Sequence, residues 1–256
     1  MLLYRLKVAR GSPRLLLTKL KTDGAFRSAR RTPPRRLWIG DSQAAVLSGA
    51  PERRLFALTP TGDAVVWLGP RPMFRIARDG LLDPMIPKLR REVDLAAAPI
   101  ILTAGGGDCR RHLVERLRNG GSLDFVAQYV ERAAELRVRL GAPHVFLVGP
   151  MPPTDPELVN EEYARNGTLA ERIAVTKQLE SELCQAVARR GDPAISVFPL
   201  GGVLGDPMTG ELARQFINDG IHPNARGSQR VREELALAEA AVLLTKALAD
   251  WPADRG

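Results

Sequence analysis

The sequence predicts an α/β protein, folded as a three-layer α/β/α sandwich around a five-stranded parallel sheet. Five short apolar runs recur along the chain, helical stretches separate them, and four of the runs end at glycine. Continuous apolar runs are typical of strands buried on both faces, and their alternation with helices favours a doubly wound sheet. We expect the flavodoxin-like strand order 2-1-3-4-5. The expected strands are residues 37–40, 64–68, 99–104, 144–148 and 194–198.

Three long helices are expected after the third, fourth and fifth strands. They span residues 122–140, 168–190 and 228–250. The second of them opens on Thr168 with Glu171 three positions later, which is the pattern of a capping box. In a doubly wound sheet, ligands bind beyond the carboxyl ends of the strands. The residues that directly follow each strand are therefore where chemistry is expected.

Length and composition exclude several classes of protein. The chain has 256 residues, of which 45 % are hydrophobic, so it can bury a sizeable core in a single domain. No apolar run reaches the roughly 18–20 residues that span a bilayer, and no secretory signal is visible. Cys109 and Cys184 make neither a disulfide framework nor a zinc site. We expect a cytoplasmic protein with no cofactor, no transmembrane segment and no metal.

The positive charge is concentrated at the N-terminus. Residues 1–36 hold eleven Lys and Arg against one acid, Asp23, whereas the formal net charge of the whole chain is +8. We therefore divide the chain into a basic N-terminal arm, residues 1–36, and a domain, residues 37–256. Such basic arms often bind anionic partners or surfaces. A solvated lead-in segment is the alternative interpretation.

A serine follows the first expected strand, in the sequence Gly40-Asp41-Ser42. A serine at a strand-to-helix turn has an exposed hydroxyl, and its backbone N–H lies at a helix N-terminus. Both features suit a nucleophile and the oxyanion that it generates. The alternative is that Ser42 only caps the helix.

A carboxylate and an imidazole stand three residues apart near the C-terminus, in Asn218-Asp219-Gly220-Ile221-His222-Pro223. This spacing lets Asp219 reach the ring of His222 and orient it. The other ring nitrogen is then free to take a proton from Ser42. The alternative is a turn with a surface histidine.

Together, Gly40-Asp41-Ser42 and Asp219-x-x-His222-Pro223 resemble the SGNH/GDSL hydrolase superfamily, in the expected order and over the whole domain. The resemblance implies a flavodoxin-like fold and hydrolysis of acyl esters without a cofactor. It also implies that Ser42 is the nucleophile, that His222 is the general base and then the acid, and that Asp219 orients His222.

The resemblance further implies an oxyanion hole formed by Ser42, Gly69 and Gly107. Gly69 follows the second strand, where the family has its oxyanion glycine, and Gly107 stands where the family has an asparagine. Gly107 in place of that asparagine is one of two departures from the family pattern; the other is Gln43 in place of the usual leucine. Either Arg110 or a backbone N–H of the glycine-rich turn is expected to replace the missing amide.

Four polar residues near the strand ends are candidates for contacting the substrate. They are Asp41, Arg71, Asp108 and Arg110. The arginines suit an anionic or polar group, and surface ion pairing is the alternative. The stretches 67–71, 108–110 and 149–153 are also similar to a bacterial SGNH-type subgroup that is often encoded beside glycan-related genes.

The sequence thus predicts a serine esterase acting on a small-molecule or glycan ester, for example an acylated carbohydrate. Three alternatives stay open. The first is an acyltransferase, in which a sugar hydroxyl replaces water. The second is a non-catalytic binding module that kept the fold. The third is an anion-binding protein that works through the arm of residues 1–36.

Overall fold

The computed structural model describes residues 13–50, 55–81, 85–159 and 163–249. A sheet of six strands lies at its centre, in the order β2-β3-β1-β4-β5-β6. The strands are β1 (Leu37–Gly40), β2 (Ala57–Leu58), β3 (Ala64–Trp67), β4 (Ile100–Thr103), β5 (Val145–Val148) and β6 (Ile195–Phe198). Five of them are parallel in the predicted 2-1-3-4-5 order. The predicted count of five is wrong by one, because the two-residue strand β2 adds an antiparallel edge.

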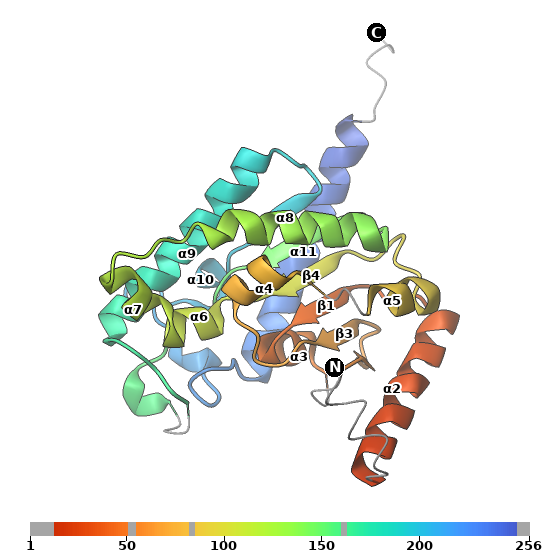
Figure 1. The fold of residues 1–256 in the computed structure, drawn as a ribbon, viewed down its shortest axis with the longest axis horizontal. Helices are drawn as coiled ribbons and strands as arrows, with labels where there is room; N and C mark the ends of the chain where they lie inside the picture. Colours follow the sequence, from red (N-terminus) through yellow and green to blue (C-terminus); the bar gives the residue numbers. More distant parts are fainter. Residues whose placement is uncertain (1–12, 51–54, 82–84, 160–162, 250–256) are drawn as a thin grey trace.

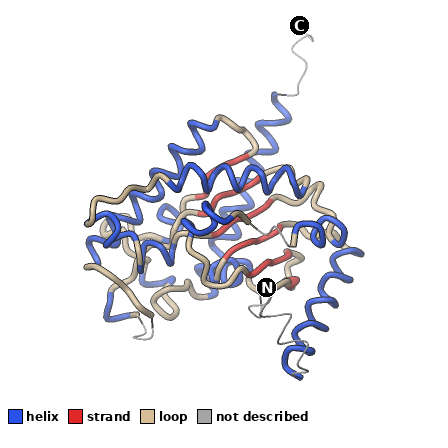
Figure 2. Tube along the Cα trace, in the orientation of Figure 1, coloured by secondary structure: helices blue, strands red, loops and turns tan. Residues whose placement is uncertain are grey.

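Helices cover both faces of the sheet, as the tube in Figure 2 shows with the strands in the middle layer. On one face lie α4 (Met73–Asp79), α5 (Ile86–Glu92), α6 (Gly106–Arg111), α7 (Leu113–Arg118), α8 (Phe125–Leu140) and α9 (Leu169–Arg190). On the other face lie α3 (Ser42–Ser48), α10 (Leu200–Leu204) and α11 (Ala225–Ala249). Two short 3-10 helices, η1 (Pro156–Leu158) and η2 (Arg214–Phe216), belong to loops. The three-layer prediction is therefore confirmed.

Local capping sets where the long helices begin. The predicted capping box is present at α9, where Thr168 accepts from the N–H of Glu171 and the Glu171 carboxylate accepts from the N–H of Thr168. Helix α11 begins three residues before the predicted start. Its first turn is closed by Asn224, whose side-chain oxygen accepts from the N–H of Gly227 at 3.0 Å. Residue 250, the predicted end of that helix, lies outside the described residues.

Part of the predicted arm packs against the domain. Helix α2 (Pro13–Arg31) runs beside β2 and α5 at the edge of the sheet (Figure 1). Phe26 is 2 % exposed and stacks on Phe56, with ring centroids 3.9 Å apart. Ala29 is also part of the core beneath this helix. From Phe26 onward the segment thus packs against the sheet edge, and the division of the chain at residue 36 stays a prediction.

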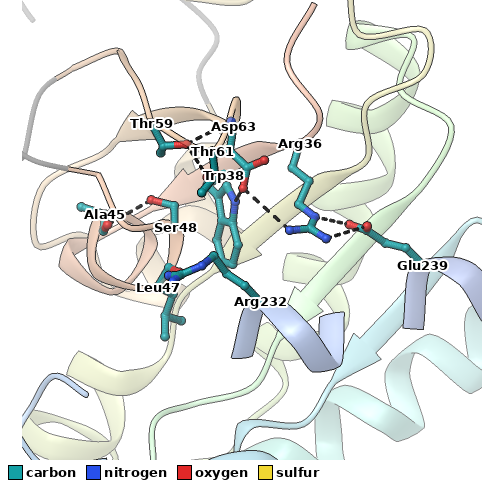
Figure 3. A network of polar contacts seen from close by, with 10 residues as sticks. All are labelled: Arg36, Trp38, Ala45, Leu47, Ser48, Thr59, Thr61, Asp63, Arg232 and Glu239. Atoms are coloured by element: carbon teal, nitrogen blue, oxygen red, sulfur yellow. Dashed lines mark hydrogen bonds and ion pairs between the residues drawn. The ribbon is translucent and has the colours of Figure 1, made fainter. Parts of the chain in front are cut away.

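A buried ionic network joins the segment to the last helix (Figure 3). Arg36 is 5 % exposed and donates two hydrogen bonds to the Glu239 carboxylate, at 2.6 and 2.9 Å. Its guanidinium also lies 3.9 Å from Asp63, which accepts the indole N–H of Trp38 at 2.9 Å. Although burial by itself lowers the pKa of Arg36, the contacts with Glu239 raise it. The network holds α11 against β1 and thus fixes the helix layer behind the site.

Among the described residues, no helix is both long and apolar enough to cross a membrane.

Candidate active site

Ser42 lies at the carboxyl end of β1, between β3 and β4, where parallel α/β sheets bind ligands. Gly40 ends the strand so close to β4 that a Cβ there would lie 2.0 Å from the Thr103 hydroxyl oxygen. The next residue, Asp41, caps α3 by accepting from the N–H of Gln43 at 2.9 Å. Ser42 is therefore the first residue of the helix, with its N–H among those that lack an intrahelical acceptor.

The loop before α11 presents the histidine. Gly220 adopts φ +81°, and a Cβ at this position would lie 2.5 Å from the Cα of Val159, so the turn requires glycine. Asp219 Oδ1 accepts from the backbone N–H of Ile221 at 3.1 Å and of His222 at 2.8 Å. This Asx turn fixes the aspartate before it contacts the imidazole.

The structure brings Ser42, His222 and Asp219 into one chain of hydrogen bonds. His222 Nδ1 lies 2.7 Å from Asp219 Oδ2, and His222 Nε2 lies 2.8 Å from Ser42 Oγ. Because an ionised carboxylate can only accept, Nδ1 carries the proton and donates it to Asp219. Nε2 is then the acceptor for the Ser42 hydroxyl. The imidazole is 2 % exposed, which holds it in this tautomer and orientation.

Asp219 is suited to stay ionised beside the imidazole. Burial alone raises the pKa of this carboxyl, but the hydrogen bonds from the ring of His222 and from two backbone N–H groups lower it below its usual value. The Tyr163 hydroxyl also donates to Asp219 Oδ2, at 3.3 Å. The negative charge that orients the ring is thus retained at neutral pH.

A cavity of 310 Å³ opens onto Ser42 and His222. Its wall comes from the carboxyl ends of β1, β3, β4 and β5, together with α6, the start of α9 and the histidine loop. The volume is at the small end of the range for ligand pockets. The hydroxyl of Ser42 is therefore accessible to a small substrate.

Comparison with solved structures identifies proteins with a similar fold. A candidate platelet activating factor from Streptococcus pneumonia shares 16 % identity with a TM-score of 0.51, covering 88 % of this chain and 98 % of that one. A candidate acylhydrolase from Bacteroides fragilis NCTC 9343 shares 16 % identity with a TM-score of 0.52, covering 86 % and 93 %. The chain has the SGNH hydrolase fold. No family model matches the sequence, and neither does any curated protein.

The residues expected as an oxyanion hole occupy different places in this SGNH fold. Ser42 and Gly107 line the cavity, and Gly107 is the second residue of α6, so its N–H lies in the first turn of a helix. Gly69 lies between Trp67 and Pro70, which both line the cavity, but it is not itself part of the wall. Its role as a donor stays a prediction.

Two of the four candidate substrate contacts are acids, and the structure separates them. Asp41 lines the cavity, and burial raises the pKa of its carboxyl to about 6. Asp108 is not in the cavity wall and is 1 % exposed; its Oδ2 accepts from the N–H of Met73 at 2.8 Å. The expectation that Asp108 contacts substrate is therefore corrected: its carboxylate ties α6 to α4.

The other two candidates, Arg71 and Arg110, both line the cavity. Arg71 is paired with Asp79 at 3.6 Å. The guanidinium of Arg110 lies over the ring of Tyr163, 5.4 Å from its centroid, and forms no ion pair with a described carboxylate. Burial and the neighbouring charge of Arg111 lower the pKa of Arg110.

Three further arginines in the wall were missed by the sequence interpretation. They are Arg111, Arg165 and Arg172. Arg111 and Arg165 carry no sequence signal, since only the fold brings their segments together. Arg172 did carry a sequence signal, because it stands seven residues before Leu179 on the buried stripe of α9, where an apolar residue is expected.

The remaining polar candidates do not form a second catalytic group. Cys109 is buried, and burial raises the pKa of its thiol to about 12, so it is a small core residue and not a nucleophile. Among the described residues, no group of His, Cys, Asp and Glu could hold a metal ion.

Proposed function

We propose that this chain is a serine ester hydrolase acting on a small ester, with Ser42, His222 and Asp219 as its catalytic residues. The observation that carries the proposal is the hydrogen-bonded chain from Asp219 through His222 to Ser42, which ends in a cavity. A buried imidazole held between a carboxylate and a hydroxyl is the arrangement that activates a serine nucleophile.

The chemistry follows from these contacts. Ser42 Oγ attacks the acyl carbonyl carbon while His222 Nε2 takes its proton, and the charge of the imidazolium is balanced by Asp219. The tetrahedral intermediate collapses as Nε2 gives the proton to the leaving alcohol, which leaves an acyl-serine. Water, deprotonated by the same nitrogen, then releases the acid and restores Ser42.

The proposed stabilisers of the oxyanion are the backbone N–H groups of Ser42 and Gly107, which both line the cavity at the start of a helix. Ser42 opens α3 and Gly107 lies in the first turn of α6. Both N–H groups are without intrahelical acceptors at these positions. Such fixed donors are among the largest contributions to catalysis of acyl transfer.

Hydrolysis of an activated ester such as p-nitrophenyl acetate tests the proposal. Ser42→Ala and His222→Ala should each remove turnover while the protein stays folded, because the two residues act as a unit. Asp219→Asn should cost less, since the loop backbone still positions the ring. Labelling by a fluorophosphonate should occur in the wild type and be lost in Ser42→Ala. Full activity in Ser42→Ala would refute the assignment; inertness of the wild type on a broad ester panel would favour the binding-module alternative.

A further inference from the structure

Arg172 is a buried cation with no carboxylate partner among the residues that the structure describes. It is 3 % exposed and lines the same cavity as Ser42. Its Nη1 donates to the carbonyl of Gly167 at 2.7 Å, but its Nη2 is buried with no hydrogen-bond partner. Burial, and then the charge of Arg165, lower the pKa of this guanidinium. An unsatisfied buried charge is costly to a folded protein, so its retention calls for a ligand.

The neighbours of Arg172 in the cavity add to the positive charge. Arg111 and Arg165 also line it, and neither forms an ion pair with a carboxylate among the described residues. The Nε of Arg111, like that of Arg110, is buried without a partner. Asp41 is the only acid among the described residues of the wall. The cavity wall thus holds three guanidinium nitrogens, on Arg110, Arg111 and Arg172, that find no hydrogen-bond partner in the described part of the chain.

The other fully buried arginine among the described residues is neutralised, which sets Arg172 apart. Arg36, equally buried, has Glu239 and Asp63 beside it. Arg71, at the cavity's edge, is paired with Asp79. A purely structural role would predict a carboxylate beside Arg172 as well, and the described residues supply none.

We propose that Arg172, with Arg111 and Arg165, binds an anionic group of the substrate, so that the enzyme acts on esters that carry a phosphate or a carboxylate. This rests on the proposed ester hydrolysis at Ser42. Guanidinium groups bind both oxyanions through paired N–H donors, and the low-dielectric wall strengthens the contact. The anionic group occupies the arginine side of the cavity, and the acyl carbon lies at Ser42.

Binding is measured first, without turnover. The Ser42→Ala chain is titrated by calorimetry with inorganic phosphate and with succinate, at low ionic strength. At least one of the two anions should bind, and Arg172→Met in the Ser42→Ala background should weaken that binding about 10- to 100-fold, the value of one or two charged hydrogen bonds. Arg189→Met, on the exposed end of the same helix, is the matched control and should leave binding unchanged.

Turnover is measured second, on two matched pairs of esters. One pair is p-nitrophenyl butyrate against the mono-p-nitrophenyl ester of glutarate, which places a carboxylate on the acyl side. The other is acetylglycerol against acetylglycerol phosphate, which places a phosphate on the alcohol side. We expect kcat/KM for the anionic member of one pair to exceed that of its neutral partner at least tenfold. Arg172→Met should reduce that ratio about 10- to 100-fold, and Arg111→Gln should reduce it in the same direction.

The thermal midpoint separates binding from a structural role. Because Arg172 is an unsatisfied charge, Arg172→Met should keep or raise the midpoint while the anionic preference falls. The proposal would be overturned if Arg172→Met and Arg111→Gln both lowered the thermal midpoint and left the anionic-to-neutral ratio of kcat/KM unchanged. Hydrolysis of neutral esters with no anionic preference would also overturn it, although the esterase assignment would then stand. Anion binding that depends on Arg172, in a wild type that hydrolyses no ester, would refute the esterase assignment and keep the anion site.

Discussion

Gln43 and Ile221 tie the serine helix to the histidine loop. Gln43 Nε2 donates a hydrogen bond of 2.6 Å to the Ile221 carbonyl. Gln43 directly follows Ser42 in α3, and Ile221 directly precedes His222, so the bond spans the two segments that must meet for proton transfer. The leucine that the family pattern has at this position cannot donate such a bond. The departure therefore has a structural role in this chain.

Replacing this glutamine should loosen the contact between Ser42 and His222. For Gln43→Leu we expect kcat to fall about 5- to 10-fold with a smaller change in KM, since one neutral hydrogen bond contributes about 1 kcal/mol. Steady-state kinetics on p-nitrophenyl acetate measure this. Gln229→Leu, which removes an exposed amide of α11 that donates to Glu233, is the control. An equal fall in kcat in Gln43→Leu and Gln229→Leu would show that the hydrogen bond of Gln43 has no specific effect on the site.

Gly107 stands where the family resemblance predicts a side-chain oxyanion donor, which glycine cannot supply. A Cβ built there meets no atom within 4 Å, and the backbone does not lie in the left-handed region. Asparagine can therefore be accommodated. Because one oxyanion donor contributes about 10²–10³ in kcat, we expect weak wild-type activity on neutral activated esters, and a rise of about tenfold or more in Gly107→Asn.

Arg110→Ala, assayed in the same series, identifies the present third donor. A fall in kcat would assign the role to Arg110, which lines the cavity. The alternative result has three parts: a high kcat in the wild type, a lower kcat in Gly107→Asn, and an unchanged kcat in Arg110→Ala. This result would show that the N–H groups of the glycine-rich turn are the donors. That result would contradict the prediction of a missing donor.

The fold was predictable where burial leaves a strong local pattern. The five parallel strands are continuous apolar runs because helices cover both of their faces, and β1, β4 and β5 are fully buried. The strand that was not predicted, β2 (Ala57–Leu58), is two residues long and has no periodicity to detect. The packing of the basic segment could not be predicted from its own sequence, because the burial of Phe26 depends on Phe56 in a different part of the chain.

The residues of the candidate site were predictable only where a local sequence motif marks them. Asp219 and His222 share one turn, and Ser42 is marked by the turn after β1. The arginine side of the cavity comes from separate segments that the fold assembles. Arg172 alone was detectable, as a charge on the apolar stripe of α9.

Phe26 should contribute to stability although it lies in the segment that the sequence predicts to be a basic arm. Phe26→Ala removes a ring that is 2 % exposed and stacks on Phe56, so we expect a loss of about 3 kcal/mol in the free energy of unfolding. Urea denaturation measures it, with the exposed neighbour Arg27→Ala as control. A loss below about 1 kcal/mol would favour the interpretation of residues 1–36 as an arm outside the domain.

Asp41 should make stability depend on pH in the direction opposite to a salt-bridged carboxylate. Burial raises the pKa of its carboxyl from 3.8 to about 6 in the folded protein. Between these two pH values the folded state keeps a proton that the unfolded state has lost, so this group's contribution to stability falls as pH rises through the window. The loss is complete above about pH 6.

Asp41→Asn removes the ionisation and keeps the cap, because asparagine caps helices as well as aspartate does. We therefore expect the free energy of unfolding of the variant, relative to that of the wild type, to increase progressively from pH 4 to pH 6. The difference should persist at pH 7 and amount to about 2–3 kcal/mol at most. Urea unfolding at pH 4, 5, 6 and 7 measures the difference. Asp155→Asn is the matched control, since Asp155 also accepts the backbone N–H two residues later, but at the surface. A difference that stays constant from pH 4 to pH 7 would mean that the Asp41 carboxylate is not desolvated, because only the cost of burying its charge makes the gain depend on pH.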